Sequence, residues 1–77
     1  MTLDQLEIGQ QATILDCGHD QAAMQLIELG FFVGERVKRT GQAPLGDPLE
    51  FIINGSRLSL RRAQASRIAI EPICQSS

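Results

Sequence analysis

Five consecutive residues of the sequence bring together side chains that bind metal ions. Asp16-Cys17-Gly18-His19-Asp20 contains a thiol, an imidazole and two carboxylates. A Cys-x-His pair supplies two ligands that Fe(II) or Zn(II) accepts, and a closed site needs about four ligands. Cys17 and His19 are therefore candidate metal ligands, with the others coming from another strand or another subunit. The alternative, which we favour, is that Cys17 packs in the core, His19 is solvated and Asp20 caps a helix.

No catalytic motif is present in the sequence. It has one histidine, and it lacks the G-x-S-x-G, Walker A, H-E-x-x-H and dinucleotide-binding glycine patterns. Asp47 lies between Gly46 and Pro48, where a carboxylate commonly accepts hydrogen bonds from nearby backbone N–H groups. We therefore expect no enzymatic activity, and we expect Asp47 to hold a turn rather than to act as an acid or a ligand.

Two adjacent arginines form the third group of interest. Arg61 and Arg62 suit an acidic partner surface or a phosphate, and they suit equally well a pair with Asp47, Glu50 or Glu71 inside the domain. Exposed ion pairs contribute about 0–1 kcal/mol to stability, so an internal pair would stabilise the fold only weakly. The sequence leaves both roles open.

The strongest local structural signal lies between Asp47 and these arginines. Residues 49–53 and 56–60 are apolar segments separated by Asn54-Gly55, which predicts a hairpin because a type I′ turn needs positive φ at both central residues. The expected facing pairs are Phe51 with Leu58 and Leu49 with Leu60 on the buried side, and Glu50 with Ser59 and Ile52 with Arg57.

A stiff loop precedes the hairpin. Ala43-Pro44-Leu45-Gly46-Asp47-Pro48, which we call the proline loop, contains two prolines and a glycine that exclude a helix and stiffen the backbone. A stiff, exposed loop is a suitable place for a binding function.

Two helical segments are predicted from capping residues. Thr2, with Gln5 three residues later, indicates a capping box and one short turn. Asp20 is suited to cap a helix over residues 21–29, and Gly30 is suited to end it. The buried face of this helix is expected to comprise Ala23, Leu26 and Ile27.

An apolar elbow, Phe31-Phe32-Val33-Gly34, follows the helix. Neighbouring residues of an extended segment point to opposite faces, so only one of the two phenylalanines is expected to fill the core. We take Phe32 as the candidate contact residue, with packing under the helix as its alternative.

The remaining segments complete a small barrel. A strand is expected over residues 11–17, with Ala12 and Ile14 inward, and another over 35–40, with Val37 inward and Lys38 or Arg39 outward. A short helical turn is expected over 61–66. A last strand is expected over 67–71, with Ile68 and Ile70 inward. Curling so small a sheet protects its edges. The fold class is therefore mainly β: an SH3-like five-stranded barrel with one α-helix inserted between strands 1 and 2 and a short N-terminal helical turn.

Composition limits the class of protein. At 77 residues the chain is one domain, 1–77, with a flexible tail expected over about 72–77. Residues 1–35 carry a charge of −6 and residues 36–77 a charge of +4, for which we favour complementary pairing over a basic binding face. The sequence shows no signal peptide or membrane span, and its two isolated cysteines are expected to be free thiols, which indicates a cytoplasmic protein.

Several segments together resemble the FeoA family, ferrous iron transport protein A, over essentially the whole chain. The matching features are the turn over residues 3–9, Leu26-Ile27-Glu28-Leu29-Gly30-Phe31 followed by Gly34, the proline loop, and Leu58-Ser59-Leu60-Arg61-Arg62-Ala63 followed by Ala65 and Ile68. The proline loop and the arginine run at this distance make the resemblance specific.

The resemblance implies a small accessory protein that assists the membrane GTPase transporter FeoB in taking up Fe(II), by binding its cytosolic part. No cofactor is required for this role, and Fe(II) or another transition metal is the candidate ligand. The chain would be cytoplasmic and recruited to the inner face of the membrane through its partner. The expected partner-binding residues are Phe32, Pro44, Leu45, Gly46, Asp47, Pro48, Arg61 and Arg62.

Two other functions remain open from the sequence. One is a transition-metal-binding or iron-sensing module related to the C-terminal domain of iron-dependent repressors. The other is a nucleic-acid-binding small barrel, against which the net charge of −2 and the three aromatic residues argue. We expect neither nucleic-acid binding nor membrane insertion, and self-association through an open barrel edge stays open.

Overall fold

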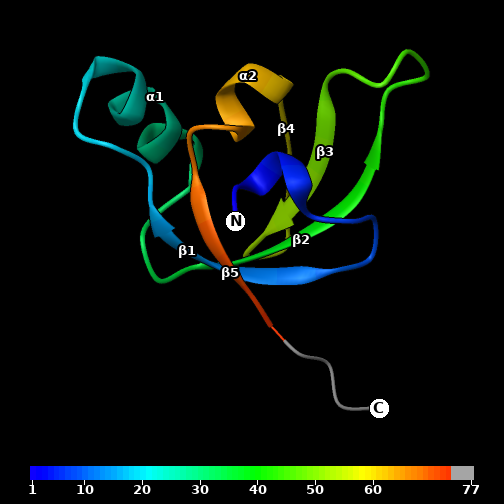
Figure 1. Ribbon diagram of the computed structural model, residues 1–77, viewed down its shortest axis with the longest axis horizontal. Coiled ribbons are helices and arrows are strands. Elements are labelled where there is room, and N and C mark those ends of the chain that lie inside the picture. The colour runs from blue at the N-terminus through cyan, green and yellow to red at the C-terminus, as the bar shows by residue number, and fades with distance from the viewer. Residues whose placement is uncertain (74–77) are drawn as a thin grey trace.

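Five antiparallel strands form one curled sheet in residues 1–73, the part of the chain that this computed structural model describes. The elements are η1 (Leu3–Gln5, a 3-10 helix), β1 (Gln11–Asp16), α1 (Gln21–Leu29), β2 (Arg36–Gln42), β3 (Leu49–Ile53), β4 (Ser56–Leu60), α2 (Arg62–Ala65) and β5 (Ala69–Pro72). The strand order is β4-β3-β2-β1-β5. Figure 1 shows the sheet curling around η1, with α1 in the connection between β1 and β2. The expected fold class is confirmed.

The β3–β4 hairpin has the register that its turn predicts. Asn54 and Gly55 both have positive φ, 52° and 79°, as a type I′ turn requires. The facing pairs are Leu49 with Leu60, Glu50 with Ser59, Phe51 with Leu58, Ile52 with Arg57 and Ile53 with Ser56. The Asn-Gly pair is therefore sufficient to set both the position and the register of this hairpin.

Helix α1 begins and ends at the residues that its caps predict. The Asp20 carboxylate accepts a hydrogen bond of 3.0 Å from the Ala23 N–H, and Gly30 takes the left-handed conformation at φ 115°. Leu26 is 1% exposed, whereas Ile27 is 40% exposed, so the expectation that Ile27 belongs to the buried face is wrong. A helix of this length buries only a narrow stripe, and Ile27 lies on its border.

Gly30→Ala is expected to destabilise the fold by about 1–2 kcal/mol, because a Cβ disfavours the left-handed conformation. The added Cβ would lie 3.6 Å from Leu58 Cδ1, an ordinary contact, so the backbone conformation is the cause of the cost. Gly41→Ala is the matched control, since Gly41 lacks positive φ and its Cβ would meet the flexible end of Glu50 at 3.4 Å. Urea unfolding should separate the two variants, and equal stability would contradict the left-handed cap.

The core is aliphatic around one aromatic pair. Phe31 and Phe51 are fully buried, with ring centroids 6.2 Å apart and ring planes at 90°, the edge-to-face geometry that aromatic rings favour. Phe32 is 47% exposed. The elbow therefore places one phenylalanine in the core and leaves the other at the surface.

Strand β2 differs from its expected form. Lys38 is exposed as expected, but Arg39 is only 7% exposed, so an outward Arg39 is wrong. Residues two apart in a strand share a face, which places Arg39 with the buried Val37. The strand also continues to Gln42 through a register shift between Arg39 and Gly41.

The N-terminal segment lies beside β5. The N–H of Ile70 donates to the Met1 carbonyl and the N–H of Leu3 donates to the Ile68 carbonyl, each at 2.9 Å. As the capping box predicts, the Gln5 side chain accepts a hydrogen bond of 3.0 Å from the Thr2 N–H.

The end of β5 extends beyond its expected limit. Pro72 is the last residue of β5, and the N–H of Ile73 donates to the Gln11 carbonyl at 2.8 Å, so these two residues are held by β1. The rest of the expected tail, residues 74–77 with Cys74, lies outside the described residues. Among the described helices, none has the length and apolar character needed to cross a membrane.

Candidate functional site

The proline loop connects β2 to β3 and is closed by its own backbone. The N–H of Ala43 donates to the Pro48 carbonyl at 2.9 Å, and the N–H of Gly46 donates to the Ala43 carbonyl at 2.8 Å. Leu45, at the tip, is 97% exposed. An apolar side chain is thus held in water by a loop with little conformational freedom.

Arg62 fastens this loop to the start of α2. Its backbone N–H donates to Asp47 Oδ1 at 3.0 Å, and its Nε donates to the Gly46 carbonyl at 2.9 Å. The expectation that Asp47 accepts from a nearby N–H to hold its own turn is wrong, because its hydrogen-bond donor among the described residues is the Arg62 N–H, fifteen residues away. The structure therefore brings Gly46, Asp47 and Arg62 together, although a hairpin separates them in the chain.

A buried arginine supports the other side of the loop. Arg39 Nη1 donates to the Leu6 carbonyl at 2.6 Å, and Nη2 donates to Gln42 Oε1 at 2.7 Å. Gln42 Oε1 also accepts a hydrogen bond from Arg62 at 3.4 Å. Burial, followed by the nearby charge of Arg62, lowers the pKa of the Arg39 guanidinium. These bonds tie the end of β2 to the residues that follow η1 and to α2.

Arg39 and Gln42 were not among the residues predicted for this site. The strand alternation contained a signal, since Val37 and Arg39 are two residues apart. An arginine is nonetheless assigned to the surface by its type alone, because charged residues are almost never fully buried unless paired. The position of Gln42 depends on the register shift in β2, which no sequence motif marks.

Neither adjacent arginine forms an ion pair with another residue that the structure describes. Within residues 1–73 the one ion pair joins Arg67 to Asp20. Arg61 is exposed at the N-cap of α2, and its backbone N–H donates to Gln64 Oε1 at 3.1 Å. Arg61 is therefore an exposed arginine directly before Arg62, the residue that holds the loop.

Phe32 does not belong to the same surface as the proline loop. In Figure 1 the segment from α1 to β2, which contains Phe32, lies on the left of the molecule, and the segment from β2 to β3, which contains the proline loop, lies at the upper right. We therefore define the loop–helix surface as residues 43–48 with Arg61 and Arg62, without Phe32.

The Cys17 and His19 segment lacks the geometry of a metal site. Cys17 is 2% exposed and its thiol donates to the Phe31 carbonyl at 3.1 Å, whereas His19 is exposed. Asp16 accepts a hydrogen bond from the Gly18 N–H, and Asp20 accepts from Ala23 and Arg67. Among the described residues, no three His, Cys, Asp or Glu side chains are placed to hold one ion. These residues do not fit a metal.

Cys17 is expected to react slowly with a thiol reagent in the native state. Burial, followed by the charge of Asp16, raises the pKa of the Cys17 thiol, so less thiolate is present at pH 8 than in an unfolded chain. In a Cys74→Ser background, reaction with a disulfide reagent should be about tenfold slower in buffer than in urea. Ser56→Cys in a chain without the natural cysteines is the exposed control. Equal rates for Cys17 in buffer and urea would contradict the buried position.

Comparison with known proteins assigns the chain to a family. The FeoA domain model matches residues 1–72. A Porphyromonas gingivalis protein, the Fe(2+) transport protein A/Fe(2+) transporter FeoB fusion protein, is 35% identical over 74 residues, which cover 95% of this chain. The chain spans only 9% of the length of that fusion protein.

Two solved structures are similar to it throughout. The solution structure of the FeoA protein from Chlorobium tepidum is 32% identical with a TM-score of 0.87, covering 100% of this chain and 74% of that one. Stenotrophomonas maltophilia FeoA complexed with zinc, described as a procaryotic SH3 domain protein, is 33% identical with a TM-score of 0.76, covering 92% and 89%. The chain has the SH3-like fold of these proteins and is a member of the FeoA domain family.

Proposed function

We propose that this chain is a protein-interaction module that binds the cytosolic part of a FeoB-type membrane GTPase during uptake of Fe(II). The fusion relative supports the choice of partner, because that protein is named as both transport protein A and FeoB in one polypeptide. The chain would act in the cytoplasm, at the inner face of the membrane, where its partner holds it.

The observation that carries the proposal is the exposure of Leu45 on a loop fixed at both ends. Leu45 is 97% exposed, while Gly46 and Asp47 beside it accept hydrogen bonds from Arg62. A rigid apolar anchor loses little conformational entropy on binding, and such anchors dominate the binding energy of many interfaces. Arg61 adds an exposed positive charge, which suits an acidic rim on the partner.

The zinc of the Stenotrophomonas structure does not lead us to propose a metal site here. That zinc belongs to that protein, and the described residues of this chain hold no cluster of ligands. The proposed role accordingly rests on contact with the transporter and not on holding the ion.

Calorimetric titration with the cytosolic part of the cognate FeoB, with and without guanine nucleotide and Fe(II), tests the proposal. We expect saturable binding by the natural chain and weaker binding by Arg62→Ala, which removes the side-chain hydrogen bonds to Gly46 and Gln42 but keeps the backbone bond to Asp47. Arg36→Ala is the matched control, since it also removes an exposed arginine but lies on the sheet. Absence of binding in every condition would contradict the partner, whereas loss of binding only in Arg36→Ala would contradict the surface.

A further inference from the structure

We propose that the free edge of β4 and the adjoining outer face of the sheet bind an extended protein segment in which acidic and apolar residues alternate. The segment would add to the sheet as a further strand beside β4. The loop–helix surface begins at Arg61, just after the end of β4, whereas this surface lies along β4 itself. The inference does not depend on the identity of the FeoB partner.

Strand β4 is the uncovered edge of the described sheet. The opposite edge, β5, is covered by residues 1–3, whose backbone bonds Ile68 and Ile70 and forms a bridge between Thr2 and Ala69. The two-residue turn joins Ile53 to Ser56, and these two residues form a hydrogen-bonded pair. Hydrogen-bonded and non-hydrogen-bonded pairs alternate along an antiparallel ladder, so β4 bonds β3 through residues 56, 58 and 60. The N–H and C=O groups of Arg57 and Ser59 therefore point away from β3.

These outward groups are available for a new strand. No hydrogen bond of Arg57 or Ser59 to other elements is found within residues 1–73. Both residues are exposed. A row of unpaired backbone donors and acceptors is the feature by which a sheet edge accepts an extended peptide.

Basic side chains cover the outer face beside this edge. Lys38 faces Ile52, and Ile52 faces Arg57, so the three side chains form one row across β2, β3 and β4. Arg36 lies two residues before Lys38 on the same face, as the exposure of both shows. None of these three basic residues is ion-paired within the described chain, since its one ion pair joins Arg67 to Asp20. The row therefore offers positive charge without a counter-ion.

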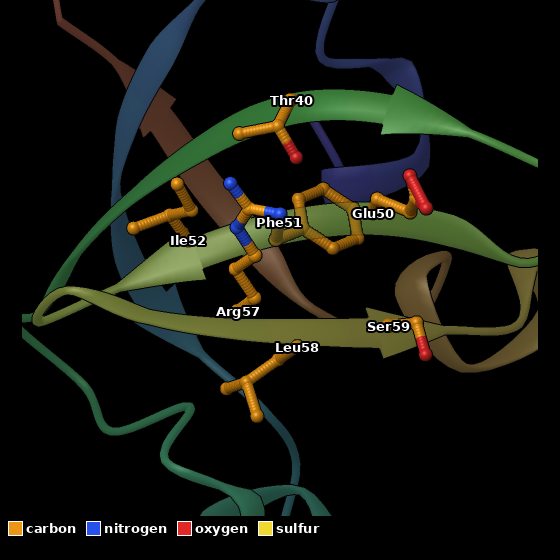
Figure 2. Close-up of a pocket in the computed structure, with 7 residues that line it drawn as sticks. All are labelled: Thr40, Glu50, Phe51, Ile52, Arg57, Leu58 and Ser59. Atoms are coloured by element: carbon orange, nitrogen blue, oxygen red, sulfur yellow. The ribbon is translucent and has the colours of Figure 1, made fainter.

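A hollow of about 430 Å³ lies in this face, along β3 and β4. Figure 2 shows Arg57 reaching from β4 across β3, with its guanidinium between Ile52 and Thr40. The Glu50 carboxylate points away from Arg57 in the same view. It lies close to Gly41, since a Cβ added to Gly41 would be 3.4 Å from Glu50 Oε2. Glu50 therefore does not neutralise Arg57, and the hollow has a basic side.

The two sides of the edge differ in what they would contact. Side chains of an added strand alternate between the two faces of the sheet. On the outer face they would meet the hollow, which has Arg57 on one side and Glu50 on the other, and a carboxylate is favoured beside Arg57. On the inner face they would meet Leu58, which is only partly buried against the core, and this favours apolar side chains. Alternation of acidic and apolar residues follows from these two contacts.

A second copy of this chain fits the edge less well. Pairing β4 with β4 would bring a second Arg57 to a face that already carries Lys38 and Arg36. Like charges placed together oppose association. The occupant is therefore a segment of another protein.

A synthetic peptide in which Glu alternates with Val, with blocked ends, is the probe for this surface. Titration followed by amide NMR should shift the signals of residues 57–60 and slow hydrogen exchange at Arg57 and Ser59. The same peptide with Lys in place of Glu should bind about tenfold more weakly or not at all.

Three variants separate the contributions of backbone and charge. Ser59→Pro removes an outward N–H without removing a β3–β4 hydrogen bond, and it should abolish binding. Arg57→Glu should weaken binding about tenfold while retaining the backbone edge. Met24→Glu is the control, because it adds a negative charge at an exposed position of α1, and it should bind the peptide as the natural chain does.

Three outcomes would overturn the inference. One is peptide-induced shifts confined to residues 43–48. The second is slowed exchange at Arg57 and Ser59 that depends on the concentration of this chain alone, which would assign the edge to a second copy. The third is binding of a single-stranded oligonucleotide, but not of the acidic peptide, to the same face. None of these outcomes bears on the FeoB titration, so the two proposals can fail independently.

Discussion

Leu45→Asp is expected to weaken binding to the cytosolic part of FeoB by about 2 kcal/mol or more, roughly thirtyfold, without affecting the stability of the free chain. A central apolar anchor typically contributes this much to an interface, and a buried carboxylate in its place would lack a partner. Leu45 is 97% exposed, so its replacement should change the free energy of unfolding by less than about 0.5 kcal/mol.

The matched control for this variant is Met24→Asp. Met24 is 62% exposed on α1. The substitution therefore introduces the same charge at an exposed apolar position away from the proline loop. Affinities from calorimetry and unfolding curves in urea give the two quantities needed. Equal affinity of Leu45→Asp and the natural chain would exclude Leu45 from the interface.

Phe51→Ala is expected to destabilise the protein by about 3–5 kcal/mol, the usual cost of replacing a buried phenylalanine with alanine. Phe51 is fully buried and packs edge-to-face on Phe31, so its removal leaves a cavity and an unpartnered ring. A domain of this size has a total stability on the order of 4–12 kcal/mol. The variant should therefore be partly unfolded at room temperature or melt at a much lower temperature.

Ile52→Ala provides the comparison for this variant, because Ile52 is next to Phe51 but on the outer face, where it is partly exposed. Its cost should be about 1 kcal/mol, since it loses less buried apolar surface. Urea unfolding of both variants measures the difference. Equal destabilisation by the two substitutions would contradict the inward position of Phe51.

The sequence predicts most of the secondary structure because its turns are marked by residues with special conformations. Asn54-Gly55 gives the hairpin register, and Asp20 with Gly30 gives both ends of α1, each confirmed by the backbone angles or hydrogen bonds. The ends of β2 and β5 are marked less clearly. They depend on a register shift after Arg39 and on pairing with β1, which are tertiary features.

Prediction of the candidate site was limited for a similar reason. The proline loop and Arg62 are visible in the sequence, but their hydrogen bonds join residues on opposite sides of a hairpin. Phe32 appears equivalent to Leu45 in the sequence, as an exposed apolar residue beside a glycine turn. Only the curl of the sheet places the two segments on different sides of the molecule (Figure 1).

Arg39 shows where residue type misled the expectation. Its alternation with Val37 predicts burial, and its charge predicts exposure. The structure resolves the conflict with hydrogen bonds from Arg39 to the Leu6 carbonyl and to Gln42, while its Nε stays buried without a partner within the described residues. A buried polar residue with a distant partner cannot be foreseen from local spacing.

Amide NMR of the labelled chain with the unlabelled cytosolic part of FeoB is the most direct test of the loop–helix surface. The account predicts that the partner broadens the signals of Leu45, Gly46, Asp47, Arg61 and Arg62 first, and that Leu45→Asp removes the broadening. Broadening confined to α1 or to β4, with the proline loop unchanged, would contradict the account.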